Sequence, residues 1–211
     1  MRMFFLWRNS HNSQPGYFSS SETWDSIHPS PPTIPWTQSV WFKDRIPKHA
    51  FILWLAMRDR LSTRDRLRSW GLNVPTNCLL CNAVPETRNH LLVECAYSTE
   101  VWASFFAHSD FTLPSSIDER VLWCEAPTAN GKVNSICKLL VQAIVYMVWR
   151  ERNSRLHSSV LKPSHVLIRE IQLILRAKLF SLDRAPNYLA SSSSSTNHCS
   201  FLHNWFQYFQ I

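Results

Sequence analysis

Cys78, Cys81, His90 and Cys95 form the sequence feature that most constrains how this chain can fold. Two residues separate the first two cysteines, eight precede the histidine, and four more precede the last cysteine. Three thiolates and an imidazole suit Zn²⁺, which takes four such ligands tetrahedrally in structural sites. Because four protein ligands leave no open position for water, the pattern predicts one structural zinc ion and argues against a catalytic metal.

The spacing of the last two candidate ligands places a condition on the backbone between them. A short helix carrying His90 is predicted over residues 87–94, and another over residues 98–108 with Ser98 as its N-cap. In an ideal α-helix, five positions turn the side-chain direction by about 500°, which leaves His90 and Cys95 about 140° apart. The helix must therefore loosen or end before Cys95 if both side chains are to bind one ion.

Zinc also supplies what residues 77–96 lack, since this segment holds too few apolar side chains to fix its own fold. A structural zinc ion contributes about 10–16 kcal/mol in small peptides. That is comparable with the stability of an ordinary domain, about 5–15 kcal/mol. The ion is therefore predicted to act as the local core of the segment.

Composition excludes several classes of protein. The 211 residues include only three glycines, and neither a GxGxxG nor a GxxxxGK[ST] run occurs, so enzymes that cradle nucleotide phosphates are not expected. Few glycines also disfavour tight hairpins and hence an all-β fold. The longest apolar stretch, residues 139–149, contains Gln142 and falls short of the roughly 20 residues that cross a bilayer. We expect neither a transmembrane helix nor a membrane partner.

The cysteines indicate a compartment. The N-terminal apolar run is too short for a signal peptide, which makes a reducing intracellular compartment, nucleus or cytoplasm, the default expectation. Six cysteines in such a compartment are better interpreted as thiols or metal ligands than as a disulfide framework. Cys124, Cys137 and Cys199 have no histidine at ligand spacing and are predicted to be plain thiols.

Periodicity predicts a mainly α fold with four regions. These are a flexible lead-in with one short helix, a small zinc-stabilised helical module, a C-terminal helical region, and a Ser-rich linker with an aromatic tail. Their predicted bounds are residues 1–35, 36–110, 118–185 and 186–211.

The predicted helices begin and end at recognisable signals. The lead-in helix starts at residues 19–22, where a serine can cap it. Within the module, Pro47 suits the first turn of one helix, and a second helix follows a Ser62 or Thr63 cap and ends at Gly71, giving a helical hairpin. Two long helices, over about 133–157 and 164–182, are expected to form an antiparallel pair because their connection is short.

Charge is distributed unevenly. Residues 43–70 carry eight basic residues and three aspartates, a net of +5, and residues 149–178 carry seven basic and two acidic residues, again +5. Residues 86–126 between them carry seven acidic and two basic residues, a net of −5. The basic hairpin could neutralise phosphates of RNA or DNA, although a solvated face paired with aspartates is the alternative. The candidate nucleic-acid contacts are Lys43, Lys48, Arg58, Arg60, Arg64, Arg66 and Arg68.

The chain resembles the reverse transcriptase zinc-binding domain of plant LINE-type retrotransposon proteins over about residues 36–105. The matching runs are residues 41–54, 61–67, 78–81, 86–95 and 101–102, with weaker similarity at 16–24 and 148–153. The resemblance implies that Cys78, Cys81, His90 and Cys95 bind zinc. No polymerase, endonuclease or ribonuclease H motif accompanies them, so the chain is not expected to be an enzyme.

Three functional hypotheses remain open from the sequence. The first is a non-catalytic, zinc-stabilised module of retrotransposon origin that binds nucleic acid through its basic helices. The second is a protein-interaction module with a purely structural zinc site, whose partner docks on an unpaired aromatic tail at residues 201–211. The third is a retroelement fragment without selected function.

Overall fold

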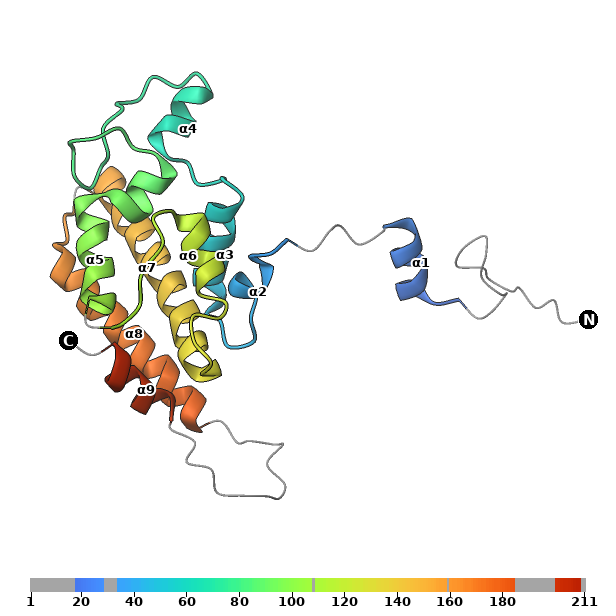
Figure 1. Cartoon of the computed structure of the whole chain (residues 1–211). Helices are drawn as coiled ribbons and strands as arrows, with labels where there is room; N and C mark the ends of the chain where they lie inside the picture. Colours follow the sequence, from blue (N-terminus) through green and yellow to red (C-terminus); the bar gives the residue numbers. More distant parts are fainter. Residues whose placement is uncertain (1–17, 29–33, 108, 159, 185–199, 210–211) are drawn as a thin grey trace, which may run out of the picture. The chain divides into compact units, whose positions relative to one another are not determined.

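The computed structural model describes residues 18–28, 34–107, 109–158, 160–184 and 200–209. This part of the chain is mainly helical and contains no strand, which confirms the predicted fold class (Figure 1). It divides into two compact units, Met1–Pro35 and Trp36–Ile211. The helices are α1 (Ser20–Ile27), α2 (Thr37–Val40), α3 (Pro47–Met57), α4 (Arg64–Ser69), the π-helix η1 (His90–Glu94), α5 (Ala96–Phe106), α6 (Ile117–Trp123), α7 (Gly131–His157), α8 (Ser164–Arg184) and α9 (Phe201–Tyr208).

Helix α1 is the described element of the first unit. It begins where the sequence predicts, because the Ser19 hydroxyl accepts a hydrogen bond from the Glu22 amide at 3.4 Å and so caps the free N-terminus. Glu22 lies in the first turn, where a carboxylate favours the positive end of the helix dipole. None of the helix's residues is buried.

Helix α7 is the central element of the second unit. It contacts α2, α3, α5, α6, α8, α9 and η1, and its residues are buried around most of its circumference. The Asn130 side chain caps it by accepting from the amides of Lys132 and Val133. By length and composition α7 could cross a membrane, but 67% of its apolar window is buried inside the protein, as in a core helix.

Helix α8 returns along α7 after a short connection. It buries a stripe of residues four positions apart, Leu167, Ile171, Leu175 and Leu179, toward α5 and α7. Near the connection, the Glu170 carboxylate of α8 forms an ion pair with Arg150 of α7. It forms a second ion pair with the Lys162 ammonium, at 2.5 Å. The zinc-ligand segment and these two long helices belong to one compact unit.

The two basic helices differ from the expected hairpin. Pro47 begins α3 as predicted, and Gly71 takes a left-handed conformation, φ 84°, just past the end of α4. However, α4 spans only six residues, none of them buried, and lies at the top of the unit in Figure 1. It is attached through its ends and through single polar contacts rather than through an apolar face.

The aromatic tail is not unpaired. Helix α9 packs against α7 and α8, and only 2% of Trp205 and of Phe209 is exposed. Phe209 lies 5.8 Å from Phe106 and 5.9 Å from Phe111, measured between ring centroids. The described part of the tail therefore completes the chain's own core, and the Ser-rich linker before it lies outside the described residues.

Candidate metal centre

The first two cysteines lie on a tight turn that follows α4. The Cys78 amide donates to the Val84 carbonyl at 2.7 Å, and the Asn82 amide donates to the Cys78 carbonyl at 2.8 Å. Asn82 takes φ 56°, a left-handed conformation that asparagine tolerates better than most residues. The Leu80 amide points back at the Cys78 sulfur, 3.4 Å away. This geometry turns both thiols of the Cys78 and Cys81 pair to the same side.

The other two candidate ligands lie at the two ends of a π-helix. In η1 the Cys95 amide donates to the His90 carbonyl, five residues back, at 2.7 Å. Cys95 then leaves the helix with φ −56° and ψ 133°. The wider turn brings His90 and Cys95 to the same side, so the prediction that the helix loosens before Cys95 is confirmed.

Helix α5 satisfies the carbonyls that the π-helix leaves without an α-helical partner. Three α5 side chains donate to the carbonyls of three successive residues. The Ser98 hydroxyl donates to the Leu91 carbonyl at 2.6 Å. Trp102 Nε1 donates to the Leu92 carbonyl at 2.8 Å, and the Thr99 hydroxyl donates to the Val93 carbonyl at 3.1 Å. The predicted role of Ser98 as an N-cap is wrong, because α5 begins two residues earlier, directly after Cys95. Ser98 instead lies buried within α5 and holds the π-helix.

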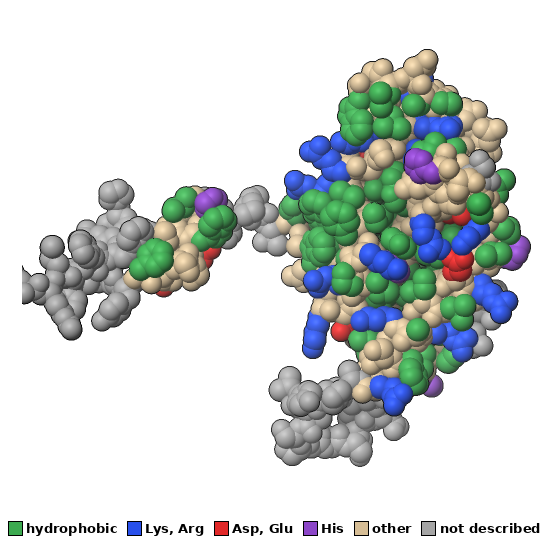
Figure 2. All heavy atoms as spheres, turned by 180° about the vertical axis from the view of Figure 1, so that it is seen from behind, with side chains coloured by type: hydrophobic (Ala, Val, Ile, Leu, Met, Phe, Trp, Pro, Cys, Tyr) green, Lys and Arg blue, Asp and Glu red, His purple; other side chains and the backbone are tan. Residues whose placement is uncertain are grey.

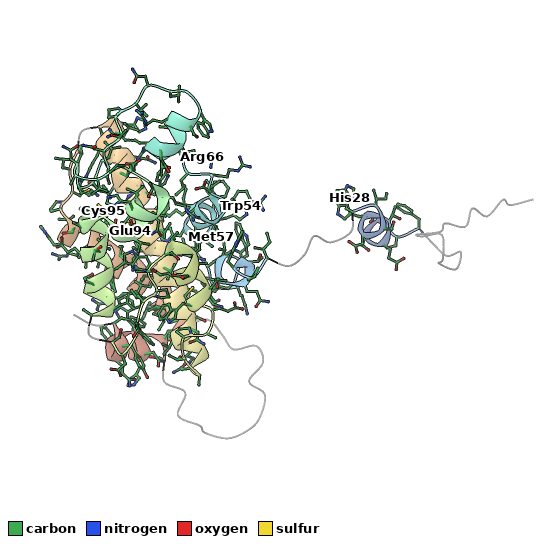
Figure 3. The ribbon with its side chains drawn as sticks, turned by 45° about the horizontal axis from the view of Figure 1, so that its top comes forward. His28, Trp54, Met57, Arg66, Glu94 and Cys95 are labelled. Atoms are coloured by element: carbon green, nitrogen blue, oxygen red, sulfur yellow. The ribbon has the colours of Figure 1, made fainter. Side chains whose placement is uncertain are left out.

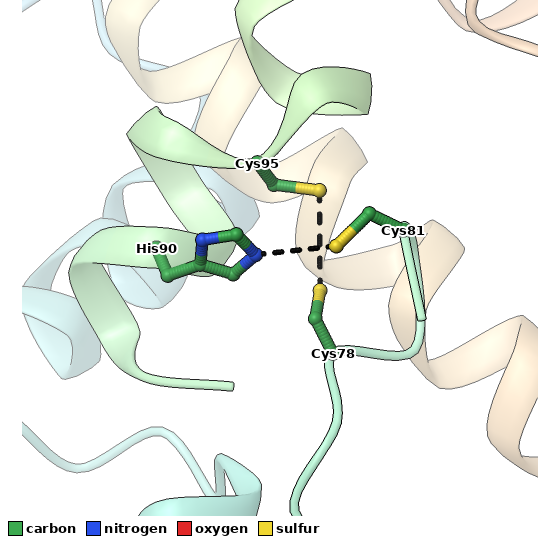
Figure 4. A group of neighbouring side chains, drawn as sticks. All are labelled: Cys78, Cys81, His90 and Cys95. Carbon is green, nitrogen blue, oxygen red and sulfur yellow. Dashed lines mark hydrogen bonds between the residues drawn. The ribbon is translucent and has the colours of Figure 1, made fainter. Parts of the chain in front are cut away.

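The four side chains converge on one point (Figure 4). All four ligand atoms lie within 4.8 Å of one another. The Cys78 and Cys95 sulfurs are 3.9 Å apart, and the Cys81 sulfur is 3.4 Å from His90 Nε2. A tetrahedral zinc ion with Zn–S bonds of about 2.3 Å requires sulfurs about 3.8 Å apart. Donor type, number and separation thus all fit one Zn²⁺.

The site is enclosed rather than open. Cys78 and Cys95 are fully buried, His90 is 6% exposed and Cys81 is half-buried. Contact between the thiols of Cys78 and Cys95 lowers the pKa of Cys78 to about 5 and raises that of Cys95. One of these sulfurs is thus readily available as a thiolate, the form that binds metal.

Comparison with known families places this geometry in context. Residues 18–102 match the family described as zinc-binding in reverse transcriptase. Over residues 18–102, the chain carries a reverse transcriptase zinc-binding domain. The match does not extend to a polymerase or nuclease domain. No curated protein and no solved structure gives a significant match.

A buried carboxylate connects the zinc-binding domain to helix α7. Glu86 is fully buried, and its Oε1 accepts from the Arg64 amide at 3.0 Å and from Arg152 at 2.8 Å (Nη2) and 3.2 Å (Nε). Its Oε2 accepts from the amide of Leu79, between the two cysteines, at 3.2 Å. One side chain therefore ties together the start of α4, the cysteine turn and α7.

Arg155, one turn further along α7, supports the same turn. Its Nη1 donates to the Leu80 carbonyl at 2.8 Å, and its Nε pairs with Glu151 at 2.8 Å. Glu151 also accepts from the Lys162 amide at 2.9 Å. The contacts that fix the cysteine turn thus include residues about fifty positions beyond the end of the family match.

Sequence reasoning assigned no role to Glu86, Arg152 or Arg155. Glu86 and Arg152 both lie within the runs that resemble the family, but these two partners are 66 residues apart in sequence, so nothing local pairs them. The available signal was a set of charges, Arg150 to Arg155, directly after the apolar run of residues 139–149. Such charges are costly inside a core unless they are paired.

Three of the seven candidate nucleic-acid contacts bind the chain's own atoms. Arg64 donates to the Asn77 carbonyl, and Arg68 donates to the Val74 carbonyl at 3.0 Å. Arg66 lies 3.6 Å from Asp59 and 5.0 Å from the Trp70 ring, and Figure 3 labels it near α4. Arg64 and Arg68 thus hold the loop between α4 and Cys78, whereas Arg66 contacts residues on either side of α4.

The other four candidates are exposed, and none of the ion pairs among the described residues involves them. They are Lys43, Lys48, Arg58 and Arg60. Among these, Lys48 lies 5.4 Å from the ring of Tyr146.

The remaining described cysteines are buried free thiols. Cys124 and Cys137 lie in the core, away from the Cys78 cluster. Burial raises the pKa of Cys124 to about 12 and raises that of Cys137 as well. Both are therefore neutral thiols at physiological pH, and Cys199 lies outside the described residues.

Proposed function

We propose that this chain is a non-catalytic module of retrotransposon origin that binds nucleic acid. In this proposal one zinc ion, held by Cys78, Cys81, His90 and Cys95, stabilises the turn and the π-helix. Zinc would supply four strong bonds that tie the cysteine turn to the π-helix. The residues of the chain supply the donor set and the enclosure that keeps water from the ion.

The nucleic-acid part of the proposal rests on one observation. Lys48 lies in α3, while Lys43, Arg58 and Arg60 flank this helix, and all four are exposed without an ion-pair partner among the described residues. Exposed cations that are not neutralised internally can replace the counterions of a phosphate backbone. The net charge of +7 acts in the same direction by steering polyanions toward the chain.

The test is binding of the zinc-loaded chain to fluorescently labelled oligouridine RNA, measured by anisotropy over a range of salt concentrations. We expect affinity to fall steeply with salt, with a log–log slope of about −0.7 per phosphate contact. Replacing Lys43, Arg58 and Arg60 with alanine should make the slope shallower by about 2.

A matched variant controls for net charge. Arg169, Arg176 and Arg184 on α8 carry the same total charge and form no ion pair among the described residues. Their replacement with alanine should leave the slope near the wild-type value. Equal losses from both triple variants would show that only overall charge matters, and an absence of binding by the wild type would refute the proposal.

A further inference from the structure

Helix α3 presents an aromatic and cationic face to solvent. Its inner face buries five residues against the bundle: His49, Ala50, Leu53, Ala56 and Met57. Its outer face carries Lys48, Phe51, Trp54 and Arg58, which recur at three- or four-residue spacing and so lie on one side of the helix. From Lys48 to Arg58 this face is about 15 Å long.

Two aromatic rings on this face remain open to solvent. Phe51 is 49% exposed and Trp54 is half-buried, and their ring centroids are 5.8 Å apart at an interplanar angle of 26°. In Figure 3, Trp54 and Met57 are labelled on the same helix, and Met57 is the buried one. Figure 2 shows apolar side chains exposed among Lys and Arg on one edge of the unit. The two rings thus form a stacked platform with a cation at each end of the helix face.

The charge on this face favours one kind of occupant. Helix α3 contains no acidic residue, so nothing on the helix repels a phosphate. Bases stack on aromatic rings while nearby cations follow the backbone, which is how proteins hold single strands. In a duplex the base faces are already covered by neighbouring bases. An acidic protein partner would also suit the charge, but it would not require two stacked rings.

We propose that the outer face of α3 binds single-stranded nucleic acid by stacking bases on Phe51 and Trp54 between Lys48 and Arg58. This inference rests on the proposed nucleic-acid function and identifies the substrate as single-stranded. The rings supply contact with the bases, and the two cations contact phosphates on either side. Arg60 and Lys43 extend the positive path beyond the helix.

The experiment compares oligothymidine with a duplex of the same length, using anisotropy and the full zinc-loaded chain. Phe51→Ala should weaken single-strand binding by about fivefold to a hundredfold, the range found for one stacked base. Duplex binding, which depends on charge, should change less than twofold. Phe180→Ala on α8 is the matched control because Phe180 is 51% exposed and also lies on a basic helix.

The outcomes separate this inference from the proposed function. If Phe51→Ala and Phe180→Ala bind single strands equally well, or if the wild type does not prefer single strands to duplex, the stacking face is refuted while nucleic-acid binding stands. If the wild type binds neither probe, the proposed function itself fails. Because Phe51 is half exposed, its replacement leaves the core intact, and an unchanged unfolding transition verifies this.

Discussion

Arg152 of α7 donates two hydrogen bonds to Glu86 Oε1, and both side chains are almost completely buried. A buried ion pair of this kind is stabilising only when its remaining hydrogen-bonding positions are filled. For Glu86 they are, because the amides of Arg64 and Leu79 complete its shell. The pair therefore fixes where the cysteine turn lies against the long helix.

Replacing Arg152 with leucine should destabilise the protein by about 3–5 kcal/mol, because it leaves a buried carboxylate without a counterion. Urea unfolding of the zinc-loaded protein measures the loss. Arg150→Leu on the same helix is the control, since Arg150 is 42% exposed in its pair with Glu170, and such pairs contribute at most about 1 kcal/mol. Similar losses for both variants would contradict the buried-pair account.

Zinc content gives a second prediction. Purified wild-type protein should hold one zinc ion per chain, and Cys78→Ser and His90→Ala should each lose it and unfold at lower denaturant concentration. Cys137→Ala should retain the ion, since Cys137 is a core thiol outside the cluster. Metal analysis together with unfolding curves checks this. A wild-type protein free of zinc, or ligand variants with full occupancy, would refute the site.

The π-helix gives a third prediction. Ser98→Ala removes the donor to the buried Leu91 carbonyl, and an unsatisfied buried acceptor costs about 1–3 kcal/mol. It should also weaken zinc binding, because η1 positions both His90 and Cys95. Ser104→Ala, in the same helix but bonded only to the Val101 carbonyl one turn back, should change stability by less than about 0.5 kcal/mol. A competition assay with a zinc chelator and urea titrations measure the two effects.

His49 makes stability depend on pH. It is fully buried against Tyr146, with ring centroids 4.3 Å apart, and neither ring nitrogen has a hydrogen-bond partner. Burial, with the charges of Lys48 and Arg150, lowers the pKa of His49 from 6.5 to about 4. The unfolded chain thus takes up this proton at a higher pH than the folded one. The stability that the neutral, buried His49 contributes to the folded protein is therefore fully present above about pH 6.5 and is lost as the pH falls toward 4.

A phenylalanine substitution isolates the contribution of His49 from protonation of the zinc ligands. Between pH 7 and pH 5 the wild type should lose about 2 kcal/mol more stability than His49→Phe. Unfolding free energies of both proteins across this range provide the comparison. Parallel curves would mean that His49 titrates alike in the folded and unfolded states.

Much of the fold follows from local signals in the sequence. Ser19, Pro47 and Gly71 mark helix ends where the structure has them, and the two long helices lie within a few residues of their predicted bounds. These signals act over a few residues, so one sequence is enough to find them. The four zinc-site residues were found for the same reason, since their spacing is local.

Other features depended on contacts that local pattern does not encode. Glu86 is held in position by its ion pair with Arg152, far along the chain. Trp205 is buried because α9 packs against α7 and α8. Ser98 illustrates a competition between two local roles. It has the residue type of a cap, but the need to satisfy the Leu91 carbonyl places it inside α5.

The link from Glu86 to Arg152 also sets an order of events during synthesis. Chains are synthesised from the N-terminus, so Glu86 is added 66 residues before its counterion Arg152. Through that interval Glu86 has only the amides of its own neighbourhood for partners. The metal-binding segment is therefore fully enclosed only after α7 has been synthesised. A ribosome that stalls before residue 152 leaves the Glu86 carboxylate without its counterion and the cysteine turn without its contacts to α7.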